Sequence, residues 1–312
     1  MSETLREVVE KGRIIRGYHL DDLRPEYVFK VPVTALTDFA YCPRYAYLRH
    51  VLGIKPLLTA ITVRALLRHE LFKRMLSKEY RLASGFRVDY SVYETAGEYF
   101  DESIRTLEGM RREFDPMLDS VGLSWSQELS EIKPLLRENS LRWATKLHDF
   151  ATVNGLEGVC LAKRFVPYRR FDLFFSAPEI GISGARVDVM ERNSPVEIKT
   201  GRVPYSGVFE VHALQLVWYG LAIEYATGID VSFGEAYYVG NLERRRLWFN
   251  GGLRRRAITM RNEAFEVFSK SEPPPISRCR RRCFLKWHCR ALGSTINLNS
   301  VINLKSDSAF DN

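Results

Sequence analysis

The sequence predicts an α/β fold in which helices flank a central sheet, and two kinds of periodicity predict it. Short runs rich in β-branched and aromatic residues, bounded by turn residues, are typical of strands. Longer segments whose apolar residues recur every three or four positions are typical of helices. From residue 158 onwards the two kinds alternate, which places helices on both faces of a sheet. We expect strands over residues 159–165, 170–176, 182–190, 196–200, 235–238 and 246–249, and helices over 209–226 and 253–268.

The N-terminal part is expected to add two helices before this sheet. Residues 1–30 are polar and predict an arm. Thr37 and Asp38 can cap a helix over 39–52, since both residue types favour that position. A second helix is expected over 60–80.

Between the early helices and the sheet lies a long segment with helical spacing. Its apolar residues recur chiefly over 103–114 and 126–150, with Pro116 and Pro134 expected to punctuate the helices. The chain then divides into an N-terminal arm with helices (1–80), a helical insertion (81–157), a core (158–270), and a cysteine-containing segment with a loose tail (271–312).

Composition indicates a globular protein with a polyanionic partner. The chain has 312 residues, of which 46% are hydrophobic and 27% charged, enough for one elaborated domain or two. No apolar run is long enough to span a membrane, and the charged N-terminus lacks an apolar signal core, so we expect a cytoplasmic protein. The net charge of +8 favours nucleic acid as a partner.

The chemistry is concentrated in one short stretch, residues 187–201. Side chains alternate across a strand, so Glu197 and Lys199 share one face. A five-residue hairpin loop over 191–195 would lay Asp188 beside Glu197. Two carboxylates and an ammonium then converge, which suits binding a divalent metal and activating a water against a phosphodiester. A surface hairpin with solvent-facing charges is the alternative from this stretch alone.

The helix that follows carries two polar residues four positions apart, Gln215 and Tyr219, which can both point at the hairpin. The order Asp, then Glu-x-Lys, then Gln-x-x-x-Tyr resembles the RecB branch of the PD-(D/E)XK nuclease superfamily. That resemblance implies a restriction-endonuclease-like fold with a mixed sheet, and residues 158–270 would be its nuclease core. The residues that carry the resemblance are Asp188, Glu197, Lys199, Gln215 and Tyr219.

The resemblance also implies a metal site. Asp188 and Glu197 would hold one or two Mn²⁺ or Mg²⁺ ions, since both metals take oxygen ligands. The carbonyl of Ile198 and the imidazole of His69 would complete the coordination, because RecB-like nucleases place a histidine on an early helix. Two other histidines remain alternatives to His69, namely His50 and His148.

The resemblance gives the remaining site residues supporting roles. Lys199 would position the water or neutralise charge that develops at the phosphate. Gln215 and Tyr219 would orient Lys199 or touch the DNA backbone, with helix packing an equal alternative for each. Tyr205 could stack on single-stranded bases, whereas Trp218 is better explained as core.

Five cysteines are spread unevenly, with three near the C-terminal end, which suggests a metal or cluster site. Those three need a fourth ligand, and Cys42 is the obvious one. Zinc and an iron–sulfur cluster both accept four thiolates, and His288 could replace one thiolate around zinc. Cys160 is expected in a strand as a buried small residue. The candidate ligands are Cys42, Cys279, Cys283 and Cys289.

The early cysteine narrows the resemblance. Tyr41-Cys42-Pro43-Arg44, the hairpin core and the terminal cysteines together resemble the CRISPR-associated RecB-like iron–sulfur adaptation nucleases. This implies a 4Fe-4S cluster that staples the two chain ends together. The three terminal cysteines are spaced three then five, where two then five is common, and residues 81–157 make the chain longer than typical members. In this extra length the chain resembles the longer archaeal variant of the family.

The function implied is a metal-dependent DNA exonuclease that processes single-stranded or frayed ends for CRISPR spacer acquisition. Its partners would be DNA and CRISPR adaptation integrase proteins, and a homo-oligomer is left open. A non-catalytic DNA-binding scaffold and a repair or recombination nuclease outside CRISPR are the alternatives. Three arginine clusters could follow phosphates or simply face solvent, at 244–246, 254–256 and 280–282.

Overall fold

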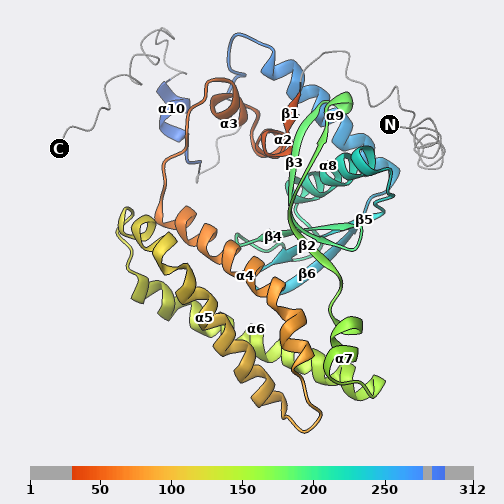
Figure 1. Cartoon of the computed structure of the whole chain (residues 1–312). Helices are drawn as coiled ribbons and strands as arrows, with labels where there is room; N and C mark the ends of the chain where they lie inside the picture. Colours follow the sequence, from red (N-terminus) through yellow and green to blue (C-terminus); the bar gives the residue numbers. More distant parts are fainter. Residues whose placement is uncertain (1–29, 277–282, 292–312) are drawn as a thin grey trace.

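The computed structural model describes residues 30–276 and 283–291, and there it shows a six-stranded mixed sheet flanked by helices (Figure 1). Strand β3 is central, because it pairs with β2 along its length, with β1 near its start and with β4 near its end. The pairs β1–β3 and β4–β5 are parallel and the others antiparallel. The predicted α/β class is confirmed. The strands are β1 (Val31–Pro32), β2 (Arg169–Ala177), β3 (Ile182–Glu191), β4 (Ser194–Lys199), β5 (Phe233–Tyr238) and β6 (Glu243–Trp248).

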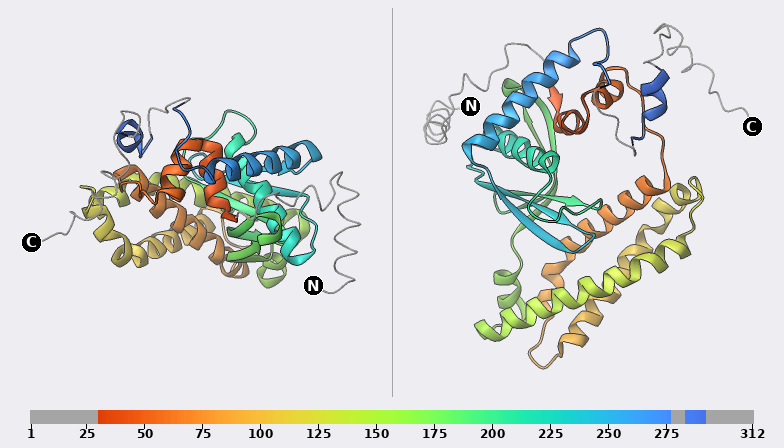
Figure 2. Two further views of the ribbon diagram at one scale, coloured as in Figure 1. Left: turned by 90° about the horizontal axis from the view of Figure 1, so that it is seen from above. Right: turned by 180° about the vertical axis from the view of Figure 1, so that it is seen from behind.

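The helices form two groups, one on each side of the sheet (Figures 1 and 2). Helices α2, α8 and α9 pack on one side, and α4 lies on the other, between the sheet and the paired helices α5 and α6. The helices are α2 (Val33–Tyr41), α3 (Pro43–Ala46), η2 (Tyr47–Val51), α4 (Ala60–Ser84), α5 (Val92–Asp119), α6 (Trp125–Asn154), α7 (Gly158–Phe165), η3 (Pro178–Ile180), α8 (Glu210–Thr227), α9 (Gly251–Phe268) and α10 (Lys286–Ala291).

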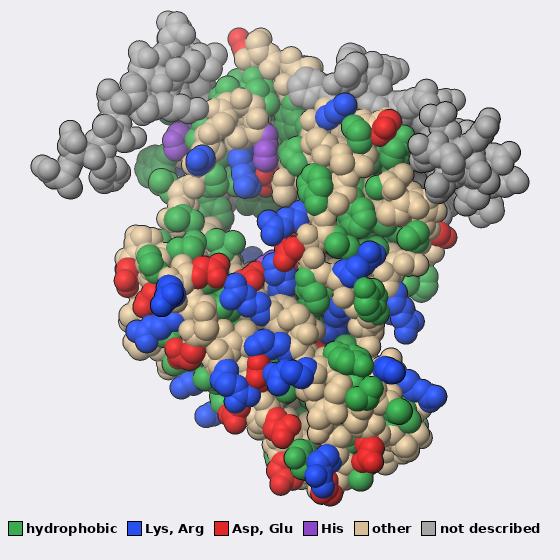
Figure 3. Space-filling model, viewed as in Figure 1, with side chains coloured by type: hydrophobic (Ala, Val, Ile, Leu, Met, Phe, Trp, Pro, Cys, Tyr) green, Lys and Arg blue, Asp and Glu red, His purple; other side chains and the backbone are tan. Residues whose placement is uncertain are grey.

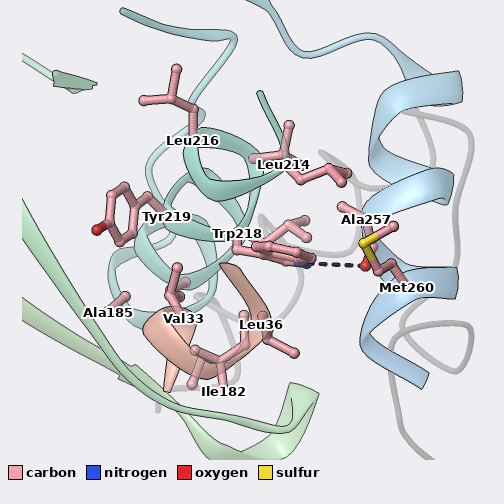
Figure 4. Close-up of a cluster of buried hydrophobic side chains, with 14 of the residues drawn as sticks. Val33, Leu36, Ile182, Ala185, Leu214, Leu216, Trp218, Tyr219, Ala257 and Met260 are labelled. Carbon is pink, nitrogen blue, oxygen red and sulfur yellow. Dashed lines mark hydrogen bonds between the residues drawn. The ribbon is translucent and has the colours of Figure 1, made fainter. Parts of the chain in front are cut away.

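The first core is centred on Trp218 of α8, which is fully buried (Figure 4). Its indole N–H donates to the carbonyl of Ala257 in α9 at 3.0 Å, so the one polar atom of this side chain is satisfied inside the core. Val33 and Leu36 of α2 and Ile182 of β3 pack in the same cluster. Trp218 is therefore core, as its helical spacing indicates, and it is not a stacking platform for bases.

The predicted strand over 159–165 is wrong, because these residues form helix α7. Leu161 and Ala162 are buried, whereas Cys160 is exposed, so the expectation of a buried Cys160 is also wrong. Eight residues are too few for periodicity to separate a short helix from a strand. The left-handed backbone of Gly158, at φ 57°, sets the start of the helix after the long α6.

The predicted helix over 39–52 is three pieces rather than one. Helix α2 begins earlier, at Val33, and ends before Cys42, whose backbone is extended at φ −164° and ψ 115°. Pro43 explains the break, because proline excludes the helical conformation from the residue before it and then starts α3. Thr37 and Asp38 lie inside α2, so they do not cap a helix.

The segment expected as an insertion is mostly helical, since α5 and α6 fill it, but its prolines do not separate the helices. Pro116 lies in the last turn of α5 and Pro134 lies inside α6. Each removes one helical hydrogen bond, a loss that the packing of two long helices against each other offsets. Ser91 and Ser124 start the two helices through reciprocal side-chain to backbone hydrogen bonds. Among the described residues, the helices are each too short or too polar to cross a membrane.

Candidate active site

The hairpin of β3 and β4 sets the geometry of the candidate site. Its register pairs Glu191 with Ser194 and Val189 with Val196, so only two residues form the turn instead of the five expected. Arg192 takes a left-handed backbone at φ 53° there, as a tight hairpin turn requires. Continuing the register by one residue puts Asp188 across from Glu197, which is the predicted juxtaposition.

Asp188 is held where the two strands part. Its Oδ2 accepts the backbone N–H of Ile198 at 3.1 Å and contacts Nε2 of His69 at 2.8 Å. Burial opposes the charge of Asp188, but the hydrogen bond and charge of His69 lower the pKa of the carboxyl below its usual value. The predicted histidine on helix α4 therefore reaches the hairpin, while Ile198 offers its N–H here.

The two alternative histidines lie elsewhere. His50 contacts Asp38 at 2.7 Å, and His148 contacts the hydroxyl of Thr95 at 2.9 Å in the insertion. For His69, burial opposes protonation, but the adjacent Asp188 outweighs it and raises the pKa of the imidazole. Of the three histidines considered, His69 is the one that the fold brings to the carboxylates.

Lys199 is oriented from two sides. Its Nζ donates to Oε1 of Glu197 at 2.9 Å and to Oε1 of Gln215 at 2.7 Å. Gln215 also donates through Nε2 to Glu197 at 2.8 Å and to the hydroxyl of Tyr219 at 2.8 Å. Helix α8 thus presents both predicted polar residues to strand β4. On the opposite face of that strand, Val196 and Ile198 pack in a second hydrophobic core, which the sheet forms with helices α4, α5 and α6.

One carboxylate oxygen in this cluster has no hydrogen-bond partner within the described part of the chain. It is Oε2 of Glu197, a residue that is only 6% exposed. Burial and the nearby charge of Asp188 raise the pKa of Glu197 to about 7, against the lowering effect of Lys199. An unpaired buried oxygen costs free energy, which a donor or a cation placed beside it would recover.

The donor set fits a divalent cation, although in this structure the side chains are hydrogen-bonded to one another. In residues 30–276 and 283–291, no group of three or more His, Cys, Asp and Glu side chains is spaced to hold a metal ion. His69 is bonded to Asp188, and Lys199 is bonded to one oxygen of Glu197. Two carboxylates and an imidazole nevertheless match Mn²⁺ or Mg²⁺, and a cation beside Asp188 would supply the partner that Oε2 of Glu197 lacks.

One site residue was missed by the sequence analysis. His212 lies on α8 one turn before Gln215, and its Nδ1 contacts the hydroxyl of Tyr238 at 3.0 Å. Burial and the charge of Lys199 lower the pKa of His212 to about 3, so it is neutral. The three- and four-residue spacing of His212, Gln215 and Tyr219 was the signal that could have found it.

The cysteines gather at a second place. Cys42, Cys283 and Cys289 line one cavity of about 360 Å³, beside the small apolar cluster of Tyr45, Leu48 and Leu285. Helix α10 lies next to α3 here (Figures 1 and 2). Arg44 links the two chain regions, because its guanidinium donates to the carbonyl of Pro274 at 2.7 Å and to that of Cys289 at 3.4 Å. The fourth predicted ligand, Cys279, lies outside the described residues.

The arginine clusters differ in what they contact. Arg254 is buried and bonded to Glu224, so it serves the core and cannot follow phosphates. Arg244 is paired with Glu191 of β3, and Arg246 with Glu235 of β5. Residues 280–282 lie outside the described part of the chain. Figure 3 shows other Lys and Arg side chains gathered around the hollow between the upper and lower parts of the molecule.

A comparison with protein families agrees with this site. The family model described as CRISPR-associated exonuclease Csa1 matches residues 4–293. The match covers most of the chain, so the chain belongs to this family and the predicted CRISPR-associated RecB-like nuclease is confirmed. The comparison with curated proteins finds no match.

Proposed function

We propose that this CRISPR-associated exonuclease is metal-dependent, acts on DNA ends and serves spacer acquisition. Its sheet and helices would form a restriction-endonuclease-like nuclease core. The unpartnered Oε2 of Glu197, buried beside Asp188, carries the proposal. A buried carboxylate oxygen without a donor is typical of a site that a ligand completes, and a divalent cation is the ligand that matches two carboxylates.

The chain would hold the metal through four groups. Asp188 and Glu197 supply carboxylate oxygens, His69 supplies Nε2 after release from Asp188, and Ile198 supplies its carbonyl. When bound, a divalent metal polarises the scissile phosphate and lowers the pKa of a coordinated water. The Ile198 N–H keeps Asp188 in place throughout, because that hydrogen bond uses the backbone of the neighbouring strand.

The remaining residues position the reacting groups. Lys199 is held by Glu197 and Gln215, so its third N–H is left to contact the attacking water or a phosphate oxygen. There its positive charge stabilises the negative charge that develops on the phosphate. Tyr219 accepts a hydrogen bond from Gln215 and so fixes the amide orientation that Lys199 needs.

A loop beside the site supports single-stranded or frayed ends as substrate. Tyr205 is fully exposed in the segment that joins β4 to α8. Arg245 donates to the carbonyls of Pro204 at 2.7 Å and Gly207 at 2.9 Å, so both flanks of Tyr205 are tied to strand β6. An exposed aromatic ring on an anchored loop is suited to stack on an unpaired base.

The function is tested by digesting end-labelled single-stranded and duplex DNA with Mn²⁺ or Mg²⁺. We expect Lys199→Ala and Asp188→Ala to abolish digestion while DNA binding survives. Lys146→Ala is the matched control, because that lysine is exposed on α6 and is not one of the candidate site residues. Digestion retained in both site variants would reject the proposal, and binding without digestion by the wild type would favour a scaffold.

We also propose that Cys42, Cys279, Cys283 and Cys289 hold a 4Fe-4S cluster. The shared cavity of three of these cysteines supports a common ligand, and four thiolates suit such a cluster. Zinc is the alternative. The buried Nδ1 of His288 supports it, because this atom has no hydrogen-bond partner among the described residues and could bind zinc.

Metal analysis of anaerobically purified protein separates the two. We expect a brown sample whose iron is lost in Cys42→Ala and kept in Cys160→Ala, since Cys160 is exposed on α7. A colourless, zinc-containing wild type would reject the cluster.

The biological setting rests on the family. A CRISPR adaptation integrase would be the protein partner, and co-purification from cells that express both would test it. A repair nuclease outside CRISPR would use the same chemistry, but the CRISPR-associated family that the chain matches disfavours it. The intact hydrogen bonds of Lys199 disfavour a purely non-catalytic scaffold, because a retired site has no need of them.

A further inference from the structure

Asp172 has an unusual backbone at an informative position. It lies inside β2 between the pairs Phe171–Val189 and Leu173–Val187, so it stands across from Asp188. Its φ is 51°, in the left-handed region that non-glycine residues rarely occupy. A strained residue within a strand, opposite a candidate metal ligand, requires a compensating contact.

That contact is the gathering of two cations. Oδ1 of Asp172 accepts from Nζ of Lys73 at 2.9 Å and from a guanidinium N–H of Arg186 at 3.1 Å. Lys73 lies one turn after His69 on α4, and Arg186 lies two residues before Asp188 on β3. Both cations therefore border the candidate active site on elements that also supply its metal ligands.

The two cations differ in what they can still bind. The side chain of Lys73 is 11% exposed and is also paired with Glu70 at 2.8 Å, so two of its three donors are used and little of it faces solvent. The side chain of Arg186 is 71% exposed, and its contact with Asp172 uses one of its five N–H donors. Arg186 is thus anchored at one edge and open to solvent at the other.

We propose that Arg186, anchored by Asp172 and backed by Lys73, binds a backbone phosphate of the DNA strand beside the phosphate that is cleaved. The inference rests on the proposed function. Residues two apart on a strand are separated by about 6.6 Å, so Arg186 reaches the same substrate strand as Asp188. A planar guanidinium binds phosphate oxygens in pairs, and its anchor reduces the freedom lost on binding.

The test measures DNA binding, not cleavage. A fluorescent single-stranded oligonucleotide of mixed sequence is titrated with full-length protein in EDTA at several salt concentrations, and anisotropy gives the affinity. We expect Arg186→Ala to weaken binding about tenfold at low salt and to reduce the slope of log affinity against log salt by about 0.7, the loss of one phosphate contact on a single strand. Arg186→Lys should keep the slope, because the charge remains.

The matched control is Arg87, which is also exposed and paired with a single aspartate, Asp89, but lies in the connection between the end of α4 and the start of α5. Arg87→Ala should leave both affinity and slope unchanged. Thermal melting checks that each variant is folded, and Arg186→Glu provides a second variant in which the slope should fall further.

Two results would overturn the inference, and they are distinguishable. If Arg186→Ala and Arg186→Glu bind with the wild-type slope while the wild type digests DNA, the phosphate contact is absent and the proposed function stands. If the wild type shows no salt-dependent DNA binding, both are removed.

Discussion

Glu197 and Glu102 are equally buried, at 6% exposure, yet their surroundings treat the charge in opposite ways. Glu197 shares one oxygen with Lys199 and leaves the other unpaired beside another carboxylate, and its pKa rises to about 7. For Glu102, burial opposes ionisation, but Lys78, Arg105 and Arg81 outweigh it and lower the pKa to about 2. Glu197 therefore has one cation beside it, whereas Glu102 has three.

The difference separates a ligand-binding site from a structural joint, that is, a set of ion pairs that connects two helices. Glu102 on α5 receives Lys78 and Arg81 of α4, so its charges connect the insertion to the helix beneath it. Three cations around one carboxylate leave nothing for a ligand to add. Glu197 has one cation, Lys199, and one buried oxygen without a donor among the described residues, a state that favours a cation from outside. Buried charge alone does not mark function in this protein, whereas a deficit of counter-charge does.

The largest expected effect follows from exchanging each carboxylate for its amide. Glu197→Gln should reduce DNA digestion by about 10³-fold or more, because a metal ligand and the partner of Lys199 are lost together. Glu102→Gln should leave the digestion rate within about twofold, since it lies in the joint. Equal losses of activity in the two variants, measured as initial rates on one labelled substrate, would erase the distinction.

Bound metal should stabilise the proteins that keep Glu197 and should not stabilise the variant that lacks it. Saturating Mn²⁺ stabilises a protein with a specific site by about 2.7 kcal/mol at 100 times the dissociation constant. We expect the melting temperature of the wild type and of Glu102→Gln to rise by several degrees with Mn²⁺ and to return with chelator, with no rise in Glu197→Gln. A rise in all three proteins would place the metal elsewhere.

The joint should show its own dependence on pH. The folded pKa of Glu102 lies below its unfolded value of about 4.5, so its stabilisation is present above pH 4.5 and is lost as pH falls toward 2. Because Arg81 and Arg105 are largely exposed and screened, we expect Glu102→Gln to cost about 1–2 kcal/mol at pH 7. Urea unfolding from pH 7 to pH 3 should show that gap closing, and a gap that stays constant would contradict the assignment.

Much of the site could be predicted because its signals are local. Alternation along β4 placed Glu197 beside Lys199, and helical spacing turned Gln215 toward them. His69 lies 119 positions from Asp188, so no periodicity could connect the two, and only the resemblance pointed to it. The roles of these residues in catalysis and metal binding stay predictions.

What the sequence could not indicate depends on pairing between distant segments. Asp172 takes its place from the register of β2 on β3 and from a left-handed backbone that aspartate seldom adopts. The strand expected over 159–165 was wrong for a local reason: a short apolar run carries too little periodicity to distinguish a strand from a helix. Pro43 did carry a readable signal, since proline restricts the residue before it, and that signal marks the break at Cys42.

His212 gives the smallest effect and extends the comparison to a buried base. Its pKa of about 3 lies below the unfolded value of about 6.5, so the unfolded chain takes up the proton first and stability falls as pH drops below 6.5. We expect the wild type to lose about 1 kcal/mol more than His212→Asn between pH 7 and pH 5.5, measured by urea unfolding. The asparagine amide can keep the contact with Tyr238, so digestion at pH 7.5 should change less than about threefold. Parallel loss of stability in both proteins would mean that His212 takes up a proton as readily in the folded as in the unfolded state. Below about pH 6.5 a second cation would then stand beside Lys199, relieving the deficit at Glu197 on which the distinction between site and joint depends.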